Sequence, residues 1–131
     1  YRVMGLQGVE LVLLGYNTPT VNSQSDEAPH LRAFHNLLSM QAGAYQNSTW
    51  VVGVAKAGDE DGHELMGGSA IIAPSGEIVA QCRTLGDELA VADCDLEATR
   101  FGKETIFDFA RHRRIEHYGL ITERTGAEPP P

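Results

Sequence analysis

The order of apolar and polar positions along the chain predicts an α/β fold. Residues 9–14 form a nearly continuous apolar run with β-branched side chains, which is typical of a strand buried on both faces of a sheet. Residues 1–8 have the pattern of a helix end, and residues 15–20 form a loop. Pro19 lacks a backbone donor and holds Thr18 extended, so the strand does not continue through this loop.

A long helix is predicted after this loop. Segment 26–29 combines acidic residues with a proline, which suits a helix start. Leu31, Phe34 and Leu38 then recur at helical spacing, so we expect a helix of about four turns that ends at Asn47. The same spacing leads us to expect that Leu31, Phe34 and Leu38 face the sheet.

The rest of the chain changes to the pattern of short strands. We predict strands over residues 49–55, 67–73, 77–83 and 88–94, and the opening of a helix at residues 95–100. A Pro-Ser-Gly turn joins two of these strands in a hairpin, with Gly76 at positive φ. Segment 59–64 has the composition of a charged connection, and residues 122–131 that of a disordered tail. The predicted domain therefore comprises residues 1–121.

Composition narrows the kind of protein. The 131 residues carry a formal net charge of -8, and the basic residues form no stripe, so we expect no nucleic-acid partner. No apolar run approaches the roughly 20 residues of a membrane span, so we expect a cytoplasmic protein without membrane contact. Because the sequence opens within a helix and without a start methionine, we expect further chain before Tyr1.

Residues with catalytic or metal-binding chemistry are few and dispersed. Cys82 and Cys94 are too far apart for a C-x-x-C motif, and the acidic neighbours of Cys94 oppose a thiolate. We interpret both cysteines as reduced and structural. His30 and His35 are five residues apart and do not share a helix face. The sequence therefore predicts no metal site and no cofactor.

Two segments leave alternatives open. Tyr16, Asn17 and Thr18 follow the carboxyl end of the first strand, which is where open α/β sheets bind ligands. The alternative is that Asn17 only adopts a turn conformation and that Thr18 bonds its own backbone. The basic segment 111–118 fits an exposed or interface role better than an anion-binding role.

Five segments occur in the order that is found in one enzyme family. They are Arg2-Val3-Met4-Gly5-Leu6, Gly15-Tyr16-Asn17-Thr18-Pro19, Leu37-Leu38-Ser39-Met40-Gln41-Ala42-Gly43, Ala73-Pro74-Ser75-Gly76-Glu77-Ile78-Val79-Ala80 and His117-Tyr118-Gly119-Leu120-Ile121. Together they closely resemble the carboxyl-terminal half of the D-carbamoylases, which are N-carbamoyl-D-amino acid amidohydrolases of the nitrilase superfamily. The Gly76 hairpin is shared widely in that superfamily, whereas the Asn17 loop and the His117 segment resemble the D-carbamoylases more narrowly.

The resemblance implies a nitrilase-type αββα sandwich, of which this chain supplies roughly the carboxyl-terminal half. The missing amino-terminal half of the same domain would then cover the apolar sheet face that a half sandwich leaves exposed. The family also implies a homodimer or homotetramer that acts on a small-molecule substrate.

The chemistry implied by the resemblance uses a Cys nucleophile, a Glu base and a Lys that opposes the charge of the oxyanion. These groups hydrolyse N-carbamoyl-D-amino acids to the D-amino acid, ammonia and carbon dioxide. All three lie upstream of this chain, so we expect no catalytic residue within it and no activity from it alone. Asn17 and Thr18 match a substrate-side loop of the family, whereas Tyr16 is expected to pack. Two alternatives remain, a non-catalytic half-sandwich module for binding or assembly and a related amidase such as a β-ureido acid hydrolase.

Overall fold

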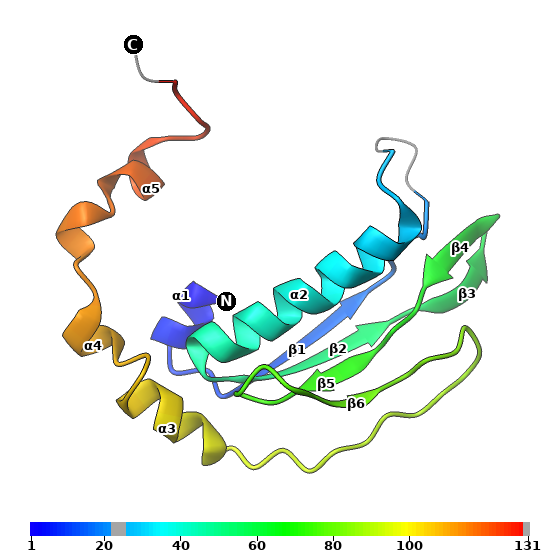
Figure 1. Ribbon diagram of the computed structural model, residues 1–131, viewed down its shortest axis with the longest axis horizontal. Coiled ribbons are helices and arrows are strands. Elements are labelled where there is room, and N and C mark those ends of the chain that lie inside the picture. Colours follow the sequence, from blue (N-terminus) through cyan, green and yellow to red (C-terminus); the bar gives the residue numbers. More distant parts are fainter. Residues whose placement is uncertain (22–25, 130–131) are drawn as a thin grey trace.

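One long helix lies across one face of a four-stranded sheet (Figure 1). The computed structural model describes residues 1–21 and 26–129. Its strands are β1 (Leu11–Tyr16), β2 (Trp50–Ala55), β3 (Ala57–Glu60), β4 (His63–Met66), β5 (Ala70–Ile72) and β6 (Ile78–Gln81), and its helices are α1 (Arg2–Leu6), α2 (Pro29–Asn47), α3 (Ala98–Glu104), α4 (Phe109–His112), the 3₁₀ turn η1 (Ile115–His117) and α5 (Gly119–Glu123). The sheet has the order β1-β2-β5-β6, with β1 and β2 parallel and the other pairs antiparallel, while β3 and β4 form a separate hairpin.

The core forms between α2 and the sheet face beneath it. Met40 and Ala44 of α2 are buried together with Val12, Val51 and Ile72, which come from three neighbouring strands. The register pairs Val12 with Val51 and Val51 with Ile72, so these three side chains share one face of the sheet. Each buried Val, Ile or Met side chain contributes about 1.5–3 kcal/mol of transfer free energy. This packing holds α2 on the sheet.

The predicted helix is confirmed as Pro29–Asn47, with the proline in its first turn. Its predicted orientation is wrong, because Leu31, Phe34 and Leu38 are 39%, 55% and 48% exposed. The helix carries two apolar stripes at helical spacing, and the stripe that faces the sheet is the one that contains Met40. Small residues near the end of that stripe let the helix approach the sheet closely, whereas the ring of Phe34 would hold it away.

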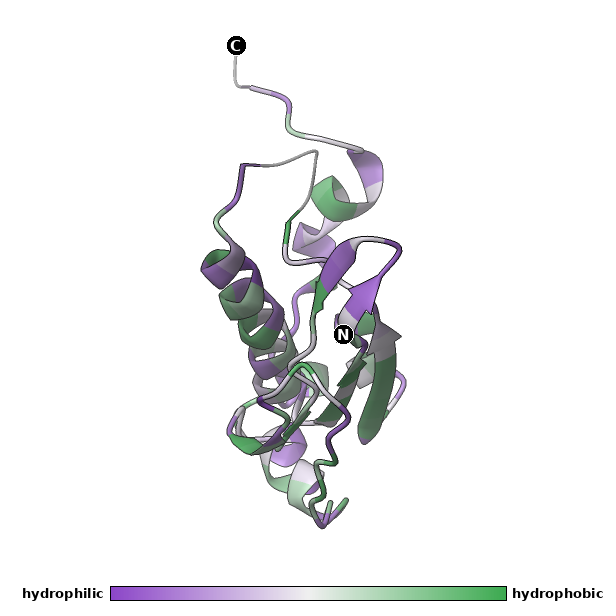
Figure 2. Ribbon diagram, turned by 90° about the vertical axis from the view of Figure 1, so that its right-hand side faces the viewer, coloured by the Kyte–Doolittle hydropathy of each residue, from purple (hydrophilic) through white to green (hydrophobic). Residues whose placement is uncertain are grey.

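The prediction that residues 9–14 are buried on both faces is also wrong for this chain. Val12 is buried, whereas Leu13 is 70% exposed, because α2 covers one face of the sheet and no described element covers the other. The register places Leu13 beside Val52, and Val54 follows on the same face of β2 with 58% exposure. Figure 2 shows that the strands of the sheet are largely hydrophobic. Leu13, Val52 and Val54 thus define an open sheet face.

Two hairpins shape the middle of the chain. The predicted hairpin after β5 is confirmed, with Gly76 at φ 86° and its N–H donating to the Ala73 carbonyl at 2.8 Å. Segment 59–64, predicted as a charged connection, instead belongs to the β3–β4 hairpin. Its turn places Asp61 at φ 53° and Gly62 at φ 79°. Asp-Gly is a strong signal for a two-residue hairpin turn, so the sequence contained this information.

The predicted strand at residues 88–94 is wrong. This segment is extended, but within residues 1–21 and 26–129 it pairs with no strand. One oxygen of the Glu88 carboxylate accepts hydrogen bonds from the N–H groups of Arg83 and Thr84, each at 2.8 Å. These bonds turn the chain away from β6 before a further strand can form.

The last quarter of the chain extends away from the sheet as a series of short helices (Figure 1). α3 begins at Ala98, within the opening predicted at residues 95–100. Residues 122–123, predicted as part of a disordered tail, belong to α5, and residues 130–131 lie outside the described residues. None of the described helices is both long enough and apolar enough to cross a membrane.

Candidate functional site

The loop that follows β1 lies at one edge of the sheet. β1 and β2 are parallel and in register, so both end at this edge, and the loop of residues 17–20 begins there. The Thr18 carbonyl accepts a hydrogen bond from the Met66 N–H at 3.0 Å, and the Thr20 N–H donates to the Glu64 carbonyl at 2.8 Å. These two bonds hold the loop against β4 and bring it beside the β3–β4 hairpin.

A hollow of about 310 Å³ lies between this loop and the hairpin. Its lining includes Asn17, Pro19, Glu60, Asp61, His63 and Leu65. Asn17 is exposed within it, whereas the half-buried Thr18 lies beside β4 through its backbone. The fold therefore brings the predicted Asn17 together with an imidazole and two carboxylates.

The charges of the hollow limit what it can bind. Glu60 forms an ion pair with the Nζ of Lys56, and Asp61 adds a second carboxylate at the hairpin turn. Because Lys56 balances the charge of Glu60, the carboxylate of Asp61 is the group that disfavours an anion here, whereas the Asn17 amide can hydrogen-bond with a neutral group.

Tyr16 supports the loop from the core side. Its hydroxyl accepts a hydrogen bond from Nδ2 of Asn36 at 2.8 Å, and its ring packs against the core cluster. Burial raises the pKa of the Tyr16 hydroxyl, and the hydrogen bond from Asn36 offsets part of that rise. The phenol is therefore neutral at physiological pH, and the prediction that Tyr16 packs is confirmed.

The residues opposite Asn17 were not predicted as part of a site. Glu60, Asp61 and His63 lie far along the chain from Asn17, in segment 59–64, for which the sequence predicts a charged connection. The Asp61-Gly62 dipeptide indicates a hairpin, but it does not indicate where that hairpin packs. Only the backbone pairing with residues 17–20 places these side chains around the hollow.

The two thiols lie away from this hollow. Cys82 is buried directly after β6, and Cys94 is half-buried; both are free. Among the described residues, no hydrogen bond joins either thiol to an imidazole or a carboxylate, and no three metal-ligating side chains cluster. Nδ1 of His35 lies 2.7 Å from Oε1 of Glu27. Within residues 1–21 and 26–129, Cys82 and Cys94 therefore lack the partners that activate a cysteine nucleophile.

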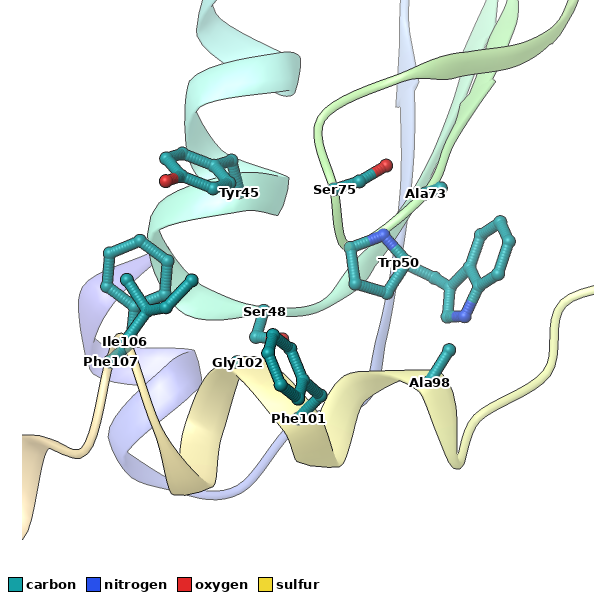
Figure 3. Close-up of a pocket in the computed structure, with 11 residues that line it drawn as sticks. Tyr45, Ser48, Trp50, Ala73, Ser75, Ala98, Phe101, Gly102, Ile106 and Phe107 are labelled. Atoms are coloured by element: carbon teal, nitrogen blue, oxygen red, sulfur yellow. The ribbon is translucent and has the colours of Figure 1, made fainter.

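A second hollow, of about 330 Å³, lies at the opposite end of the sheet between α2, the β5–β6 turn and α3. Figure 3 shows Tyr45, Trp50, Phe101 and Phe107 around it. Nε1 of Trp50 donates to the Asp95 carbonyl at 2.8 Å, and the Ser48 hydroxyl donates to the Thr99 carbonyl at 2.9 Å. The rings of Tyr45 and Phe107 meet edge to face at 5.0 Å. This hollow is lined mainly by apolar and aromatic side chains.

The basic segment 111–118 is spread over α4, η1 and the residues beside them. The Arg113 guanidinium lies 5.1 Å from the centre of the Tyr118 ring, and Arg2 lies 4.0 Å from that of Phe109. Ile115 is 70% exposed in the same segment. Of the arginines in this segment, Arg113 thus lies against an aromatic ring, and the exposure of Ile115 fits the exposed or interface role that the sequence favours.

Three solved structures have a similar fold. A carbon-nitrogen hydrolase from Helicobacter pylori G27 is 22% identical, with a TM-score of 0.78 over 94% of this chain and 44% of its own. The E41Q mutant amidase from Nesterenkonia sp. AN1 is 22% identical, with a TM-score of 0.59 over 88% of this chain and 36% of its own. Saccharomyces cerevisiae Nit3, a member of branch 10 of the nitrilase superfamily, is 18% identical, with a TM-score of 0.63 over 88% of this chain and 38% of its own.

The fold is therefore the nitrilase-like α/β fold, and the chain spans less than half the length of these proteins. The model of the carbon-nitrogen hydrolase family matches residues 1–104, which is most of the chain. The chain belongs to the carbon-nitrogen hydrolase family.

Proposed function

We propose that this chain is the carboxyl-terminal part of a D-carbamoylase. The complete protein would hydrolyse N-carbamoyl-D-amino acids to the D-amino acid, ammonia and carbon dioxide in the cytoplasm. The observation that carries this proposal is the ordered set of five sequence segments, the loop of Asn17 and the segment of His117 above all, within a member of the carbon-nitrogen hydrolase family.

The proposed reaction has two steps on a cysteine that lies outside this chain. A Glu takes the thiol proton, the sulfur attacks the carbamoyl carbon, and ammonia leaves with that proton while a Lys opposes the oxyanion charge. Water then attacks the remaining thiocarbamate, the thiol is restored, and the carbamate loses carbon dioxide to give the free amine. The structure of the Nesterenkonia amidase mutant shows covalent addition of the acetamide moiety of fluoroacetamide at its active-site cysteine, which supports a nucleophilic cysteine in the proposed mechanism.

In this mechanism, residues 1–121 supply substrate contacts rather than catalytic groups. Asn17 and Thr18 bind the part of the substrate that becomes the amino acid, with the Asn17 amide in the hollow beside β4. The carboxylate of Asp61 disfavours the substrate carboxylate at this point, so we place the substrate carboxylate away from the hairpin turn. No metal or cofactor takes part.

The open sheet face supports the proposal that the missing half packs on this chain. Leu13 and Val54 leave an apolar surface that a soluble domain normally covers. The outward stripe of α2, with Leu31, Phe34 and Leu38, is a second apolar surface. We assign the first to the amino-terminal half of the domain and the second to self-association into a dimer or tetramer.

Ammonia release tests the proposed function. We expect the complete protein to release ammonia from N-carbamoyl-D-amino acids, to act poorly on the L enantiomers, and to lose all activity when reduced to these 131 residues. Ammonia from β-ureido acids or simple amides instead would identify a different amidase. If the complete protein released no ammonia from any of these substrates, the result would favour a non-catalytic assembly module.

Asn17 is the residue whose loss should affect substrate use most within this chain. In the complete protein, we expect Asn17→Ala to lower kcat/KM roughly tenfold to thirtyfold through loss of one substrate hydrogen bond. Asn17 is exposed, so the midpoint of thermal unfolding should not move. Gln46→Ala, which removes another exposed amide near the opposite end of the sheet, is the matched control. Equal kcat/KM values for Asn17→Ala and Gln46→Ala would show that Asn17 does not contact the substrate.

A further inference from the structure

A buried arginine lies behind the loop that carries Asn17. Arg32, in the first turns of α2, is 9% exposed, and its Nη1 donates a hydrogen bond to the Pro19 carbonyl at 3.0 Å. Its Nε lies 3.7 Å from Oε2 of Glu27 and has no hydrogen-bond partner among the described residues. Removing a guanidinium from water costs several kcal/mol of desolvation free energy, which its hydrogen bonds and ion pairs must offset. An apolar residue at this position would not carry that penalty. General stability therefore does not account for Arg32.

The loop geometry explains what the guanidinium does. On one side, residues 18 and 20 bond β4 through the Thr18 carbonyl and the Thr20 N–H. Between them, Pro19 pairs with Leu65 in an isolated bridge, and as a proline it has no N–H to offer on its other side. The Pro19 carbonyl is therefore the backbone group that can bond with α2, and it accepts the hydrogen bond from Arg32. The loop is thus fixed from β4 and from α2 at once.

We propose that Arg32 is a positioning residue, which clamps the Pro19 carbonyl and so holds Asn17 in the orientation that binds substrate. Glu27 keeps the guanidinium charge balanced at the start of α2. The role in substrate use rests on the proposed function, whereas the clamp itself is a property of the fold. Arg32 does not line the hollow, so it acts through the loop rather than by contact with substrate.

A double-mutant cycle in the complete protein tests this role. We expect Arg32→Met to lower kcat/KM roughly tenfold, mainly through KM, because a loosened loop misplaces the Asn17 amide. Arg32→Lys should recover part of the loss, since it restores one charged donor. The double variant with Asn17→Ala should lose no more than Asn17→Ala alone. If the fold-loss of kcat/KM in the double variant equals the product of the two single fold-losses, Arg32 does not act through Asn17, and the proposal is overturned.

Amide hydrogen exchange tests the clamp without any substrate. In Arg32→Met, the N–H groups of Thr20 and Met66 should exchange roughly tenfold faster while those of β2 remain protected. Arg100→Met is the control, because Arg100 is an exposed arginine paired with Glu97 and Glu104. Unchanged exchange in Arg32→Met would overturn the clamp. Faster exchange in a protein that hydrolyses no N-carbamoyl substrate would leave the clamp in place and refute only the proposed function.

Discussion

Replacing Leu13 with aspartate is expected to destabilise the complete protein by about 3–5 kcal/mol, because the carboxylate would be buried without a partner. Leu13 is 70% exposed on the open sheet face of this chain. In the isolated chain, a substitution at so exposed a position should change stability by no more than about 0.5 kcal/mol. The large effect therefore arises only if the amino-terminal half covers this face. Urea unfolding of the complete protein measures the difference.

Val3→Asp is the matched control for this prediction. Val3 is also 70% exposed, but it lies on α1 rather than on the sheet. We expect Val3→Asp to unfold at nearly the same urea concentration as the unmodified protein, whereas Leu13→Asp should unfold at a much lower urea concentration. Equal midpoints for Leu13→Asp and Val3→Asp would mean that no other part of the protein packs on the sheet face.

The second large effect is expected at the contact between α3 and the end of α2. Gly102→Ala should lower the free energy of unfolding by about 3 kcal/mol, although alanine is the better helix former by about 1 kcal/mol. The new Cβ would lie 2.6 Å from the Cβ of Ser48. Ser48 is buried at φ 45°, and its hydroxyl donates to the Thr99 carbonyl at 2.9 Å, so it has little freedom to move. The overlap and the disturbed hydrogen bond outweigh the gain in propensity.

A second substitution separates this overlap from a general effect of alanine. Ser48→Gly removes the atoms that the new Cβ would meet, and glycine accepts the left-handed conformation at that position. We expect Gly102→Ala combined with Ser48→Gly to recover at least half of the lost stability. Gly86→Ala should be neutral, because nothing lies within 4 Å of its added Cβ. Thermal unfolding of the four variants measures this, and a Gly102→Ala protein as stable as Gly86→Ala would refute the close contact.

Local signals in the sequence accounted for the elements that were predicted well. The proline before the apolar repeat marked the start of α2, and the Pro-Ser-Gly turn marked the hairpin at Gly76. Both depend on backbone preferences of a few adjacent residues, which act in the same way whatever packs on them. The prediction of a strand at residues 88–94 was wrong because a strand depends on a partner strand as well as on local preferences. Glu88 turns the chain away from β6, which would have been that partner.

Contacts between distant segments decided the rest of the site. Asn17 could be proposed from the sequence because the end of a strand can be located from the apolar run before it. Its neighbours Asp61 and His63 and the clamp from Arg32 depend on how β4 and α2 pack on the loop, which no spacing along the chain encodes. Periodicity states which positions of a helix are apolar, but it does not state which surface they meet.

The types of most elements, the family resemblance and the place of Asn17 at the end of β1 could be predicted from the amino-acid sequence, because these depend on local conformation and on motifs in order. That α2 packs through Met40 and turns Phe34 outward, and that Leu13 and Val54 form an open face, became clear from the folded arrangement. The physical reason is that packing selects among apolar surfaces by shape and by available partners. For this chain, part of that selection belongs to the half of the domain that we propose to pack on it.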